Sequence, residues 1–152
     1  MSSTVISDTS CLIFIGKIDL LNFVSQTYQT VYITPAIARE YGLELPNWIV
    51  VREPVDNLKV KELELEMDLG EATAIALALE IKDCDLLLDD LAARNYALQH
   101  QLKFTGTLGI LLKAKEKNEI EKVRPLLEKL KTHGLRISEA VEKEVLKLAS
   151  EL

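Results

Sequence analysis

The stretch that decides the fold is LLLDDLAARNYALQ, residues 86–99. Its three leucines form a short apolar run of the kind found in a strand buried inside a parallel sheet. The Ala-rich segment that follows, from Leu91 to about His100, predicts a helix. Asp89 and Asp90 fall between the two. The sequence therefore predicts a pair of acids at the carboxyl end of a central strand.

A further acid, Asp8, occupies the same kind of position near the start of the chain. The β-branched run TVIS, residues 4–7, predicts a strand, and the hydroxyl residues after Asp8 are suited to starting a helix over residues 11–25. In an open parallel sheet, ligands bind in the crevice outside the carboxyl ends of the strands. We therefore expect Asp8 to converge there with Asp89 and Asp90.

Two glutamates complete this set of acids. Glu40 lies in a helix that Thr34 is expected to cap, and Glu71 opens an apolar helix over residues 71–82, directly after Gly70, where we expect the chain to break. Each acid alone has an ordinary explanation as a cap, a partner of the helix dipole or an exposed side chain. Together, the five carboxylates predict one acidic, metal-binding site.

Strands and helices alternate along the rest of the chain, which predicts an α/β fold. The central parallel sheet is expected to have about four to five strands flanked by helices, with a C-terminal helical extension over about residues 119–152. The further expected strands are residues 31–33, 48–51 (an edge or accessory strand) and 103–104, and the further expected helices are residues 56–67, 108–117, 121–131 and 138–150.

Length and composition suit one domain spanning residues 1–152, because 48% of the residues are hydrophobic and no low-complexity tract interrupts them. The longest clean apolar stretch, residues 72–79, is far short of the roughly 18 residues that span a bilayer. No secretory signal pattern is present. We therefore expect a cytoplasmic protein without a membrane partner. Cys11 and Cys84 lie among apolar residues, which predicts two reduced core cysteines.

The formal charge of −6 argues at first against nucleic acid as a partner, because nucleic-acid-binding domains are usually basic. The charge is unevenly distributed, however. Residues 1–100 carry 7 basic and 16 acidic side chains (7 − 16 = −9), and residues 101–152 carry 11 basic and 8 acidic ones (11 − 8 = +3). The basic third could face a phosphate backbone, although such a run is usually a solvated helix face.

Five strings together give most of the chain a resemblance to the PIN domain, the nuclease fold of VapC-like toxins. They are VISDTS at 5–10, TPAIARE at 34–40, GEATAIALA at 70–78, LLDDLAAR at 87–94 and TGTLG at 105–109. The resemblance implies a PIN-like fold and a divalent-metal-dependent ribonuclease that hydrolyses RNA phosphodiester bonds. It also implies a homodimer and a small antitoxin protein as partners.

By position, the family's catalytic acids fall on Asp8, Glu40, Glu71 and Asp90. Asp89 lies nearer the strand and is the alternative to Asp90 as a direct ligand. Glu71 stands where these toxins more often carry aspartate, and its longer side chain would shift the metal.

Four polar residues are expected to support the acids. Thr9, Thr105 and Thr107 could hold waters or a phosphate oxygen. Arg94 lies one helical turn after Asp90, so a local salt bridge is expected for it, with contact to a phosphate as the alternative.

The clustering of carboxylates has a physical consequence that does not depend on the family. Each pair within about 4 Å repels by roughly 1 kcal/mol in water and by several-fold more in a partly buried cleft. Mg²⁺ or Mn²⁺, which prefer oxygen ligands, would remove this penalty. We expect Asp8 and Asp90 as direct ligands, Glu40 and Glu71 as ligands through water or at a second ion, and Asp89 as a ligand or an orienting group.

Other classes remain to be weighed. The position two residues after Asp8 is Ser10, which disfavours a phosphatase of the haloacid-dehalogenase type, and no GxxxxGK[ST] motif is present. A PIN-like module that binds RNA or protein without cutting stays open, as do the RNA substrate and a toxin or RNA-processing role.

Overall fold

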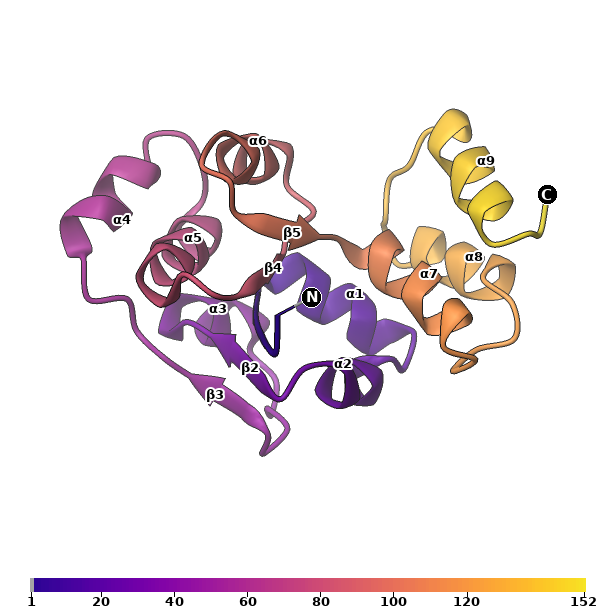
Figure 1. Cartoon of the computed structure of the whole chain (residues 1–152), viewed down its shortest axis with the longest axis horizontal. Helices are drawn as coiled ribbons and strands as arrows, with labels where there is room; N and C mark the ends of the chain where they lie inside the picture. Colours follow the sequence, from indigo (N-terminus) through magenta and orange to yellow (C-terminus); the bar gives the residue numbers. More distant parts are fainter. Residues whose placement is uncertain (1) are drawn as a thin grey trace.

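The computed structural model describes residues 2–152, and these contain a single parallel sheet at the centre of the molecule (Figure 1). The strand order is β3-β2-β1-β4-β5, and each neighbouring pair is parallel. The strands are β1 (Thr4–Ser7), β2 (Thr30–Ile33), β3 (Ile49–Val51), β4 (Asp85–Leu87) and β5 (Lys103–Thr105). The predicted α/β class with a parallel sheet is confirmed, and β3 is the edge strand that was expected.

Helices connect the strands and continue beyond the last one. They are α1 (Thr9–Lys17), α2 (Leu21–Thr27), α3 (Pro35–Tyr41), α4 (Asn57–Leu63), α5 (Leu69–Ile81), α6 (Leu91–Gln99), α7 (Thr107–Glu116), α8 (Arg124–Thr132) and α9 (Glu139–Leu148). Among residues 2–152, every helix is too short or too polar to be a membrane span.

The core is built around the two strands that the sequence analysis started from. Val5 and Ile6 of β1 and Leu86 and Leu87 of β4 are almost completely buried, because helices cover the sheet on both faces and leave no polar side to these strands. Helix α5 contacts both strands and is buried from Ala72 to Ala78. The apolar helix expected there is confirmed, and its small alanine side chains suit packing against the sheet.

The helix expected over residues 11–25 is wrong, because the chain forms two helices there. Helix α1 ends at Lys17 and α2 begins at Leu21. Between them, Asp19 takes a positive φ of 59°. This turn buries Ile18 and Leu20 in the core, which a continuous helix would not do for both side chains.

Two helix starts also differ from expectation. Gly70 does not break the chain but lies inside α5, buried in its first turn. The helix expected from residue 121 begins instead at Arg124, with a proline in its first turn. Proline is well tolerated there because the first amides of a helix have no partner within the helix.

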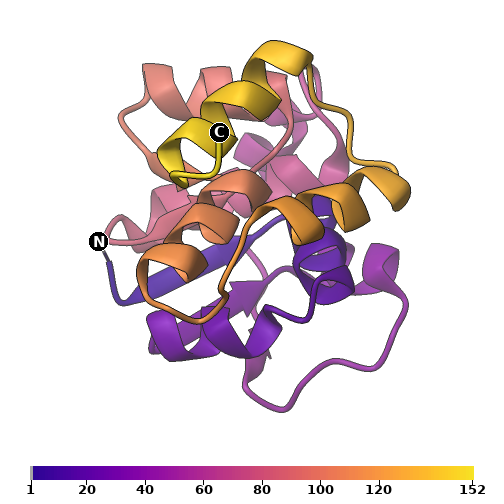
Figure 2. The same cartoon turned by 90° about the vertical axis from the view of Figure 1, so that its right-hand side faces the viewer.

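The C-terminal helices α7, α8 and α9 lie together at one end of the molecule (Figure 1), and Figure 2 shows them in front of the strands. Helix α8 contacts α1, and α9 contacts α7. Glu151, just beyond α9, accepts hydrogen bonds from Lys115 Nζ at 2.9 Å and from the backbone amides of Val123 at 2.6 Å and Arg124 at 3.0 Å. This single carboxylate therefore ties the end of the chain to α7 and to the start of α8.

Candidate active site

The crevice at the carboxyl ends of β1 and β4 brings the first acids together. The chain continues from β1 to β2 on one side, and β4 pairs with the other side of β1, so the strand order reverses between β1 and β4. Ligands bind at such switch points in open α/β sheets. Beyond the strands, the Asp8 amide donates to Leu87 O at 3.0 Å, and the Asp89 amide donates to Asp8 Oδ2 at 3.3 Å.

Asp8 is the innermost of these acids, and only 1% of its surface is exposed. Its Oδ1 accepts a hydrogen bond from the Cys11 amide at 2.8 Å, so the side chain caps α1. Burial raises the pKa of Asp8 to about 6, and the charge of Asp89 adds to this rise, while the hydrogen bond from Cys11 opposes it. The buried charge is stabilised by amide dipoles, and no cation among residues 2–152 forms an ion pair with it.

Glu71 is the second acid whose ionisation is costly. It is half-buried in the first turn of α5. Desolvation raises its pKa to about 7, with smaller contributions from the charges of Asp8, Asp68 and Asp90. Glu71 is therefore within electrostatic reach of acids from the ends of both β1 and β4, which is the arrangement expected at a site that binds a cation.

Glu40 joins the group from α3. Its Oε1 accepts a hydrogen bond from Thr9 Oγ1 at 3.1 Å. A side chain at position 70 would run into Glu40 Oε1, so Gly70 makes room for the glutamate between the first turns of α1 and α5. Glu40 is exposed, and it lies beside Thr9 and Gly70, the chain neighbours of the two acids with raised pKa.

The adjacent acids Asp89 and Asp90 have different surroundings. Asp89 accepts two hydrogen bonds from Thr107, from its amide to Oδ1 at 2.9 Å and from its hydroxyl to Oδ2 at 2.6 Å. Asp90 is exposed, and its Oδ2 caps α6 by accepting from the Ala93 amide at 2.9 Å. Asp89 is thus fixed against α7, whereas Asp90 caps α6 through one oxygen and its charge contributes to the raised pKa of Glu71.

The supporting residues are arranged differently from what the sequence indicated. Thr107 is buried and donates its hydroxyl to Asp89, so it positions an acid. Arg94 approaches Asp89, not Asp90, with 4.0 Å between Nη2 and Oδ1. Its Nε donates to Leu88 O at 2.7 Å. The salt bridge of Arg94 is therefore local as expected, but with the other acid of the pair.

The donor set allows a test of whether a divalent cation fits. Among residues 2–152, no three side chains of His, Cys, Asp or Glu are grouped so that they could hold a metal by themselves. Magnesium, however, usually binds through one or two carboxylates together with waters and substrate phosphate. Burial raises the pKa values of Asp8 and Glu71, and the charges of neighbouring acids add to the rise. No lysine or arginine among residues 2–152 pairs with Asp8 or Glu71, so carboxylate oxygens of this donor set fit a cation held by few protein ligands.

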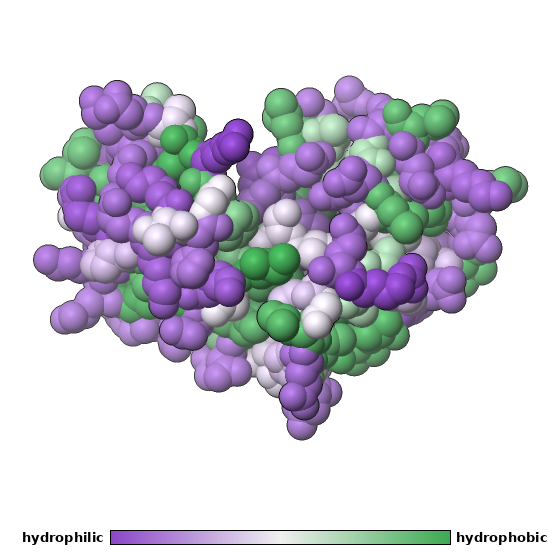
Figure 3. All heavy atoms as spheres, turned by 180° about the vertical axis from the view of Figure 1, so that it is seen from behind, coloured by the Kyte–Doolittle hydropathy of each residue, from purple (hydrophilic) through white to green (hydrophobic). Residues whose placement is uncertain are grey.

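A cleft of about 440 Å³ adjoins Asp89, and sequence reasoning missed part of it. Its lining includes Arg94 and Phe104 from the sheet side and Leu135, Arg136 and Ile137 from the connection between α8 and α9. Figure 3 shows the surface hollowed between its two sides. A single arginine between two apolar residues is not a recognisable binding motif in the sequence. Only the fold shows that Arg136 and Arg94 line the same cleft.

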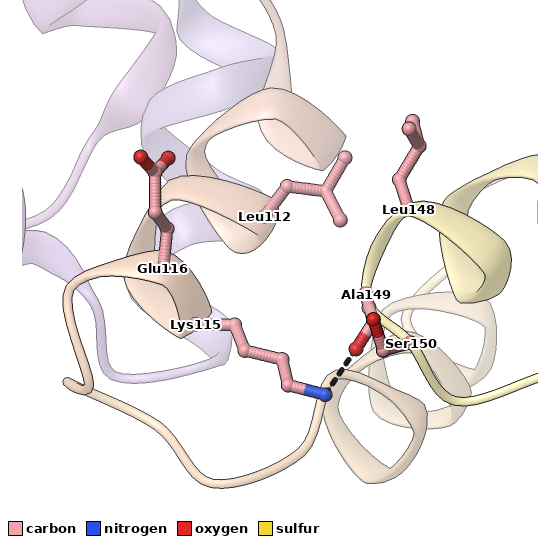
Figure 4. Close-up of a pocket in the computed structure, with 6 residues that line it drawn as sticks. All are labelled: Leu112, Lys115, Glu116, Leu148, Ala149 and Ser150. Carbon is pink, nitrogen blue, oxygen red and sulfur yellow. Dashed lines mark hydrogen bonds between the residues drawn. The ribbon is translucent and has the colours of Figure 1, made fainter.

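A cavity of about 510 Å³ lies within the C-terminal helices and contains none of the candidate acids (Figure 4). Its lining comes from α7 and the end of α9, namely Leu112, Lys115, Glu116, Leu148, Ala149 and Ser150. Lys115 Nζ reaches across it to donate to Ala149 O. This contact belongs to the tie around Glu151, so the cavity reflects how the helices are joined and not the acidic chemistry.

Comparison with known proteins gives one match. The model of the family DUF3368, a PIN domain, matches residues 4–151. All five strings that carry the resemblance described above lie within this range. Searches of curated proteins and of solved structures found no match.

Proposed function

The chain belongs to the PIN-domain family, and on this premise we propose that it is a divalent-metal-dependent endoribonuclease that hydrolyses RNA phosphodiester bonds. PIN domains are generally nucleases, and the parallel sheet with its flanking helices is consistent with that fold. Membership of the family implies a nuclease-like domain that acts on a nucleic acid. We propose in addition that the nucleic acid is RNA and that cleavage depends on a divalent metal.

One observation carries the proposal: two carboxylates from different elements share the crevice between β1 and β4, each with its pKa raised. Asp8 follows β1 and Glu71 lies in the first turn of α5, and their pKa values are raised to about 6 and about 7. A purely structural carboxylate is normally placed where a cation or several donors stabilise its charge. Acids that destabilise each other are typical of sites completed by a cation or a substrate.

In the proposed mechanism, Asp8 and Asp90 would be the direct ligands of a bound cation, and Glu40 and Glu71 would act through water or at a second ion. Asp89, fixed by Thr107, orients the group through the hydrogen bond from its amide to Asp8. Thr9 holds Glu40 in place. When bound, Mg²⁺ or Mn²⁺ supplies a water of lowered pKa and stabilises charge on the phosphate.

The family also suggests how the activity would be used. We propose a cytoplasmic homodimer that acts as the toxin of a toxin-antitoxin pair, held inactive by a small antitoxin protein. An RNA-processing role is the alternative with the same chemistry.

A second candidate function, a PIN-like module that binds RNA or a protein without cutting, rests on a specific observation. No group of three possible ligands is preformed among residues 2–152, and Asp89 and Asp90 already accept hydrogen bonds from Thr107 and Ala93. In this alternative, the acids only shape the crevice, and removing them would leave binding intact.

The experiment that separates the two candidates is cleavage of labelled single-stranded and structured RNA by the purified protein with Mn²⁺, Mg²⁺ or EDTA. Asp8→Asn and Asp90→Asn are the test variants, and Asp83→Asn, an exposed acid before the amino end of β4, is the matched control. Cleavage that needs metal and is lost in both test variants, but kept in the control, supports the nuclease. RNA binding without cleavage under every condition supports the silent module.

A further inference from the structure

We propose that the cleft beside Asp89 binds one nucleotide of a single-stranded RNA, next to the bond that the acids would cut. This inference rests on the proposed function and adds the residues that would hold the substrate. The cleft is lined by Arg94 and Arg136, by the ring of Phe104 and by aliphatic side chains. Two guanidinium groups suit a phosphate, and the apolar lining suits a base.

The position of the cleft connects it to the acids. Asp89 lines the cleft, and its backbone amide donates to Asp8 at 3.3 Å. An RNA strand in the cleft would therefore continue directly toward the crevice between β1 and β4. Asp89 itself weakens anion binding little, because Thr107 donates two hydrogen bonds to its carboxylate and Arg94 is close to it.

Arg94 is held in place before any substrate binds. Its Nε donates to Leu88 O at 2.7 Å, and its guanidinium lies 5.3 Å from the centre of the Phe104 ring. Nη2 faces Asp89 across 4.0 Å, and a guanidinium held in this way can meet a phosphate through Nη1 with little loss of side-chain freedom. A side chain at position 106 would collide with Arg94 Nη2 and Asp89 Oδ1, which explains why glycine follows β5.

Arg136 supplies the second charge from a distant part of the chain. It is exposed, and within residues 2–152 it forms neither a hydrogen bond nor a salt bridge. Its neighbours Leu135 and Ile137 line the cleft and pack against the core, so the arginine is anchored on both sides at the cleft. An uncommitted arginine at the rim of a half-apolar cleft is suited to a charged ligand with a planar apolar part.

Single-stranded RNA fits this chemistry better than a small anion or a duplex. A free phosphate would use the arginines but not Phe104, Leu108 or Ile137, which also line the cleft. Bases of a duplex are stacked and cannot enter a cleft of about 440 Å³, whereas unstacked bases of a single strand can be taken up by apolar side chains.

The test measures binding separately from cleavage. The full chain is titrated, in EDTA, against a fluorescently labelled single-stranded oligoribonucleotide at several salt concentrations, and anisotropy gives Kd. The test variant is Arg136→Gln. Lys143→Gln, an exposed basic residue of α9 that does not line the cleft, is the matched control because it removes the same charge.

We expect Arg136→Gln to raise Kd about five- to tenfold, the size of one lost phosphate contact. The slope of log K against log salt should fall by about 0.7, the value for one phosphate on a single strand. Lys143→Gln should leave both quantities near the wild-type values. An unlabelled RNA duplex should compete poorly.

Three results would overturn the inference, and they can be told apart. If the wild-type protein and Arg136→Gln bind RNA equally well, the proposed role of the cleft is wrong. The proposed nuclease activity is still supported in that case if cleavage is lost in Asp8→Asn. Equal weakening by Arg136→Gln and Lys143→Gln means that only the net charge matters. If the wild-type protein binds no RNA and cuts none, the proposed function fails together with the cleft.

Discussion

Asp8 and Glu151 are both nearly buried carboxylates, with 1% of Asp8 and 8% of the Glu151 side chain exposed, yet the protein shifts their pKa values in opposite directions. The pKa of Asp8 rises to about 6. Burial acts on Glu151 as well, but the hydrogen bonds from Lys115, Val123 and Arg124 outweigh it and lower its pKa to about 2.

The difference lies in what surrounds each carboxylate. Glu151 has a lysine and two backbone amides as donors, and its charge is stabilised by the folded protein. Asp8 has two backbone amides, but its charged neighbours include Asp89 and Glu71, which are acids. Desolvation raises the pKa of both carboxylates, but only Glu151 has enough donors and a lysine to reverse that rise. The charge of Asp89, at the end of the neighbouring strand, adds to the rise at Asp8, which is why we propose the acidic site there.

The largest expected effect comes from Asp8→Asn. RNA cleavage should fall by about 100-fold or more, as when one catalytic group is removed. Folding stability in EDTA at pH 8 should instead rise by about 1 kcal/mol, because removing a charge whose pKa is shifted by about two units yields at most about 3 kcal/mol and one hydrogen bond to the side chain is lost. Cleavage assays and urea unfolding measure the two quantities.

Asp83→Asn is the control for both measurements, since it removes an exposed acid from before the other end of a neighbouring strand. It should change neither cleavage nor stability appreciably. Added Mg²⁺ should raise the melting temperature of the wild-type protein and of this control more than that of Asp8→Asn. A less stable Asp8→Asn protein in EDTA would contradict the view that the charge of Asp8 is costly.

Glu151→Gln should have the opposite combination of effects. The amide cannot pair with Lys115 as a charge, and only its oxygen can accept from the amides of Val123 and Arg124. We expect a loss of about 2 kcal/mol in the free energy of unfolding, with cleavage per folded molecule unchanged. Urea unfolding and cleavage at low temperature test both parts. Glu144→Gln, an exposed change on α9, should leave stability within about 0.5 kcal/mol.

The sequence predicts the elements that depend on neighbouring residues and misses the features that depend on contacts between distant parts of the chain. The β-branched run at 4–7 and the apolar run at 86–88 predict β1 and β4, because β-branched residues favour strands and a strand buried on both faces needs no alternating pattern. The turn at Asp19 was missed, because the local pattern is helical and only the burial of Ile18 and Leu20 favours the break. Gly70 was misread as a helix breaker, since its reason is the nearby Glu40 side chain.

The same limit applies to the candidate site. The strand-end rule placed Asp8 beside the pair Asp89 and Asp90 without knowledge of any contact. Asp89 and Asp90 have different hydrogen-bond partners because Thr107 donates to Asp89. Thr107 lies 18 residues beyond Asp89, so no local sequence pattern predicts this contact. The contribution of Arg136 to the cleft depends on how α8 and α9 are docked, which lies further still from what periodicity can show.

The pH dependence of folding stability should show the effects of carboxylates with raised pKa values and of one with a lowered pKa. Acids with raised folded pKa values contribute stability that is present below their unfolded pKa and is lost as the pH rises through the folded value. For Asp8 and Glu71 this means stability lost between about pH 4 and pH 7. Glu151 acts in the opposite sense: its contribution is present above pH 4.5 and is lost as the pH falls toward about 2.

Urea unfolding in EDTA should therefore show a gain of about 1 to 2 kcal/mol as the pH is lowered from 8 to 5, discounted because Glu71 is partly solvated. Stability should then decrease toward pH 2. Asp8→Asn should reduce the gain, and Glu151→Gln should reduce the decrease. A wild-type profile that is flat from pH 8 to 5 would mean that these acids are stabilised in the fold, and the contrast with Glu151 would disappear.

The smallest expected effect on stability comes from Gly70→Ala, which tests whether a backbone position serves the acids. The new methyl group would meet Glu40 Oε1, and this flexible side chain would swing away and lose its hydrogen bond to Thr9. Alanine favours a helix by up to about 1 kcal/mol over glycine, which offsets that loss, so stability should change by less than about 1 kcal/mol. Cleavage should fall by about tenfold, less than the roughly 100-fold or more expected when a catalytic group is removed, because Glu40 is displaced and not deleted.

Gly16→Ala is the matched control, because it also places a methyl group on a helical glycine, but against Leu21 Cδ1 at an ordinary 3.5 Å. It should leave cleavage unchanged. The decisive measurement is a double-mutant cycle with Glu40→Ala. If Gly70 acts by making room for Glu40, then Gly70→Ala causes no further loss of cleavage once Glu40 has been removed. An equal loss in both backgrounds would mean that the methyl group does not act through Glu40, and the proposed reason for glycine at position 70 would be wrong.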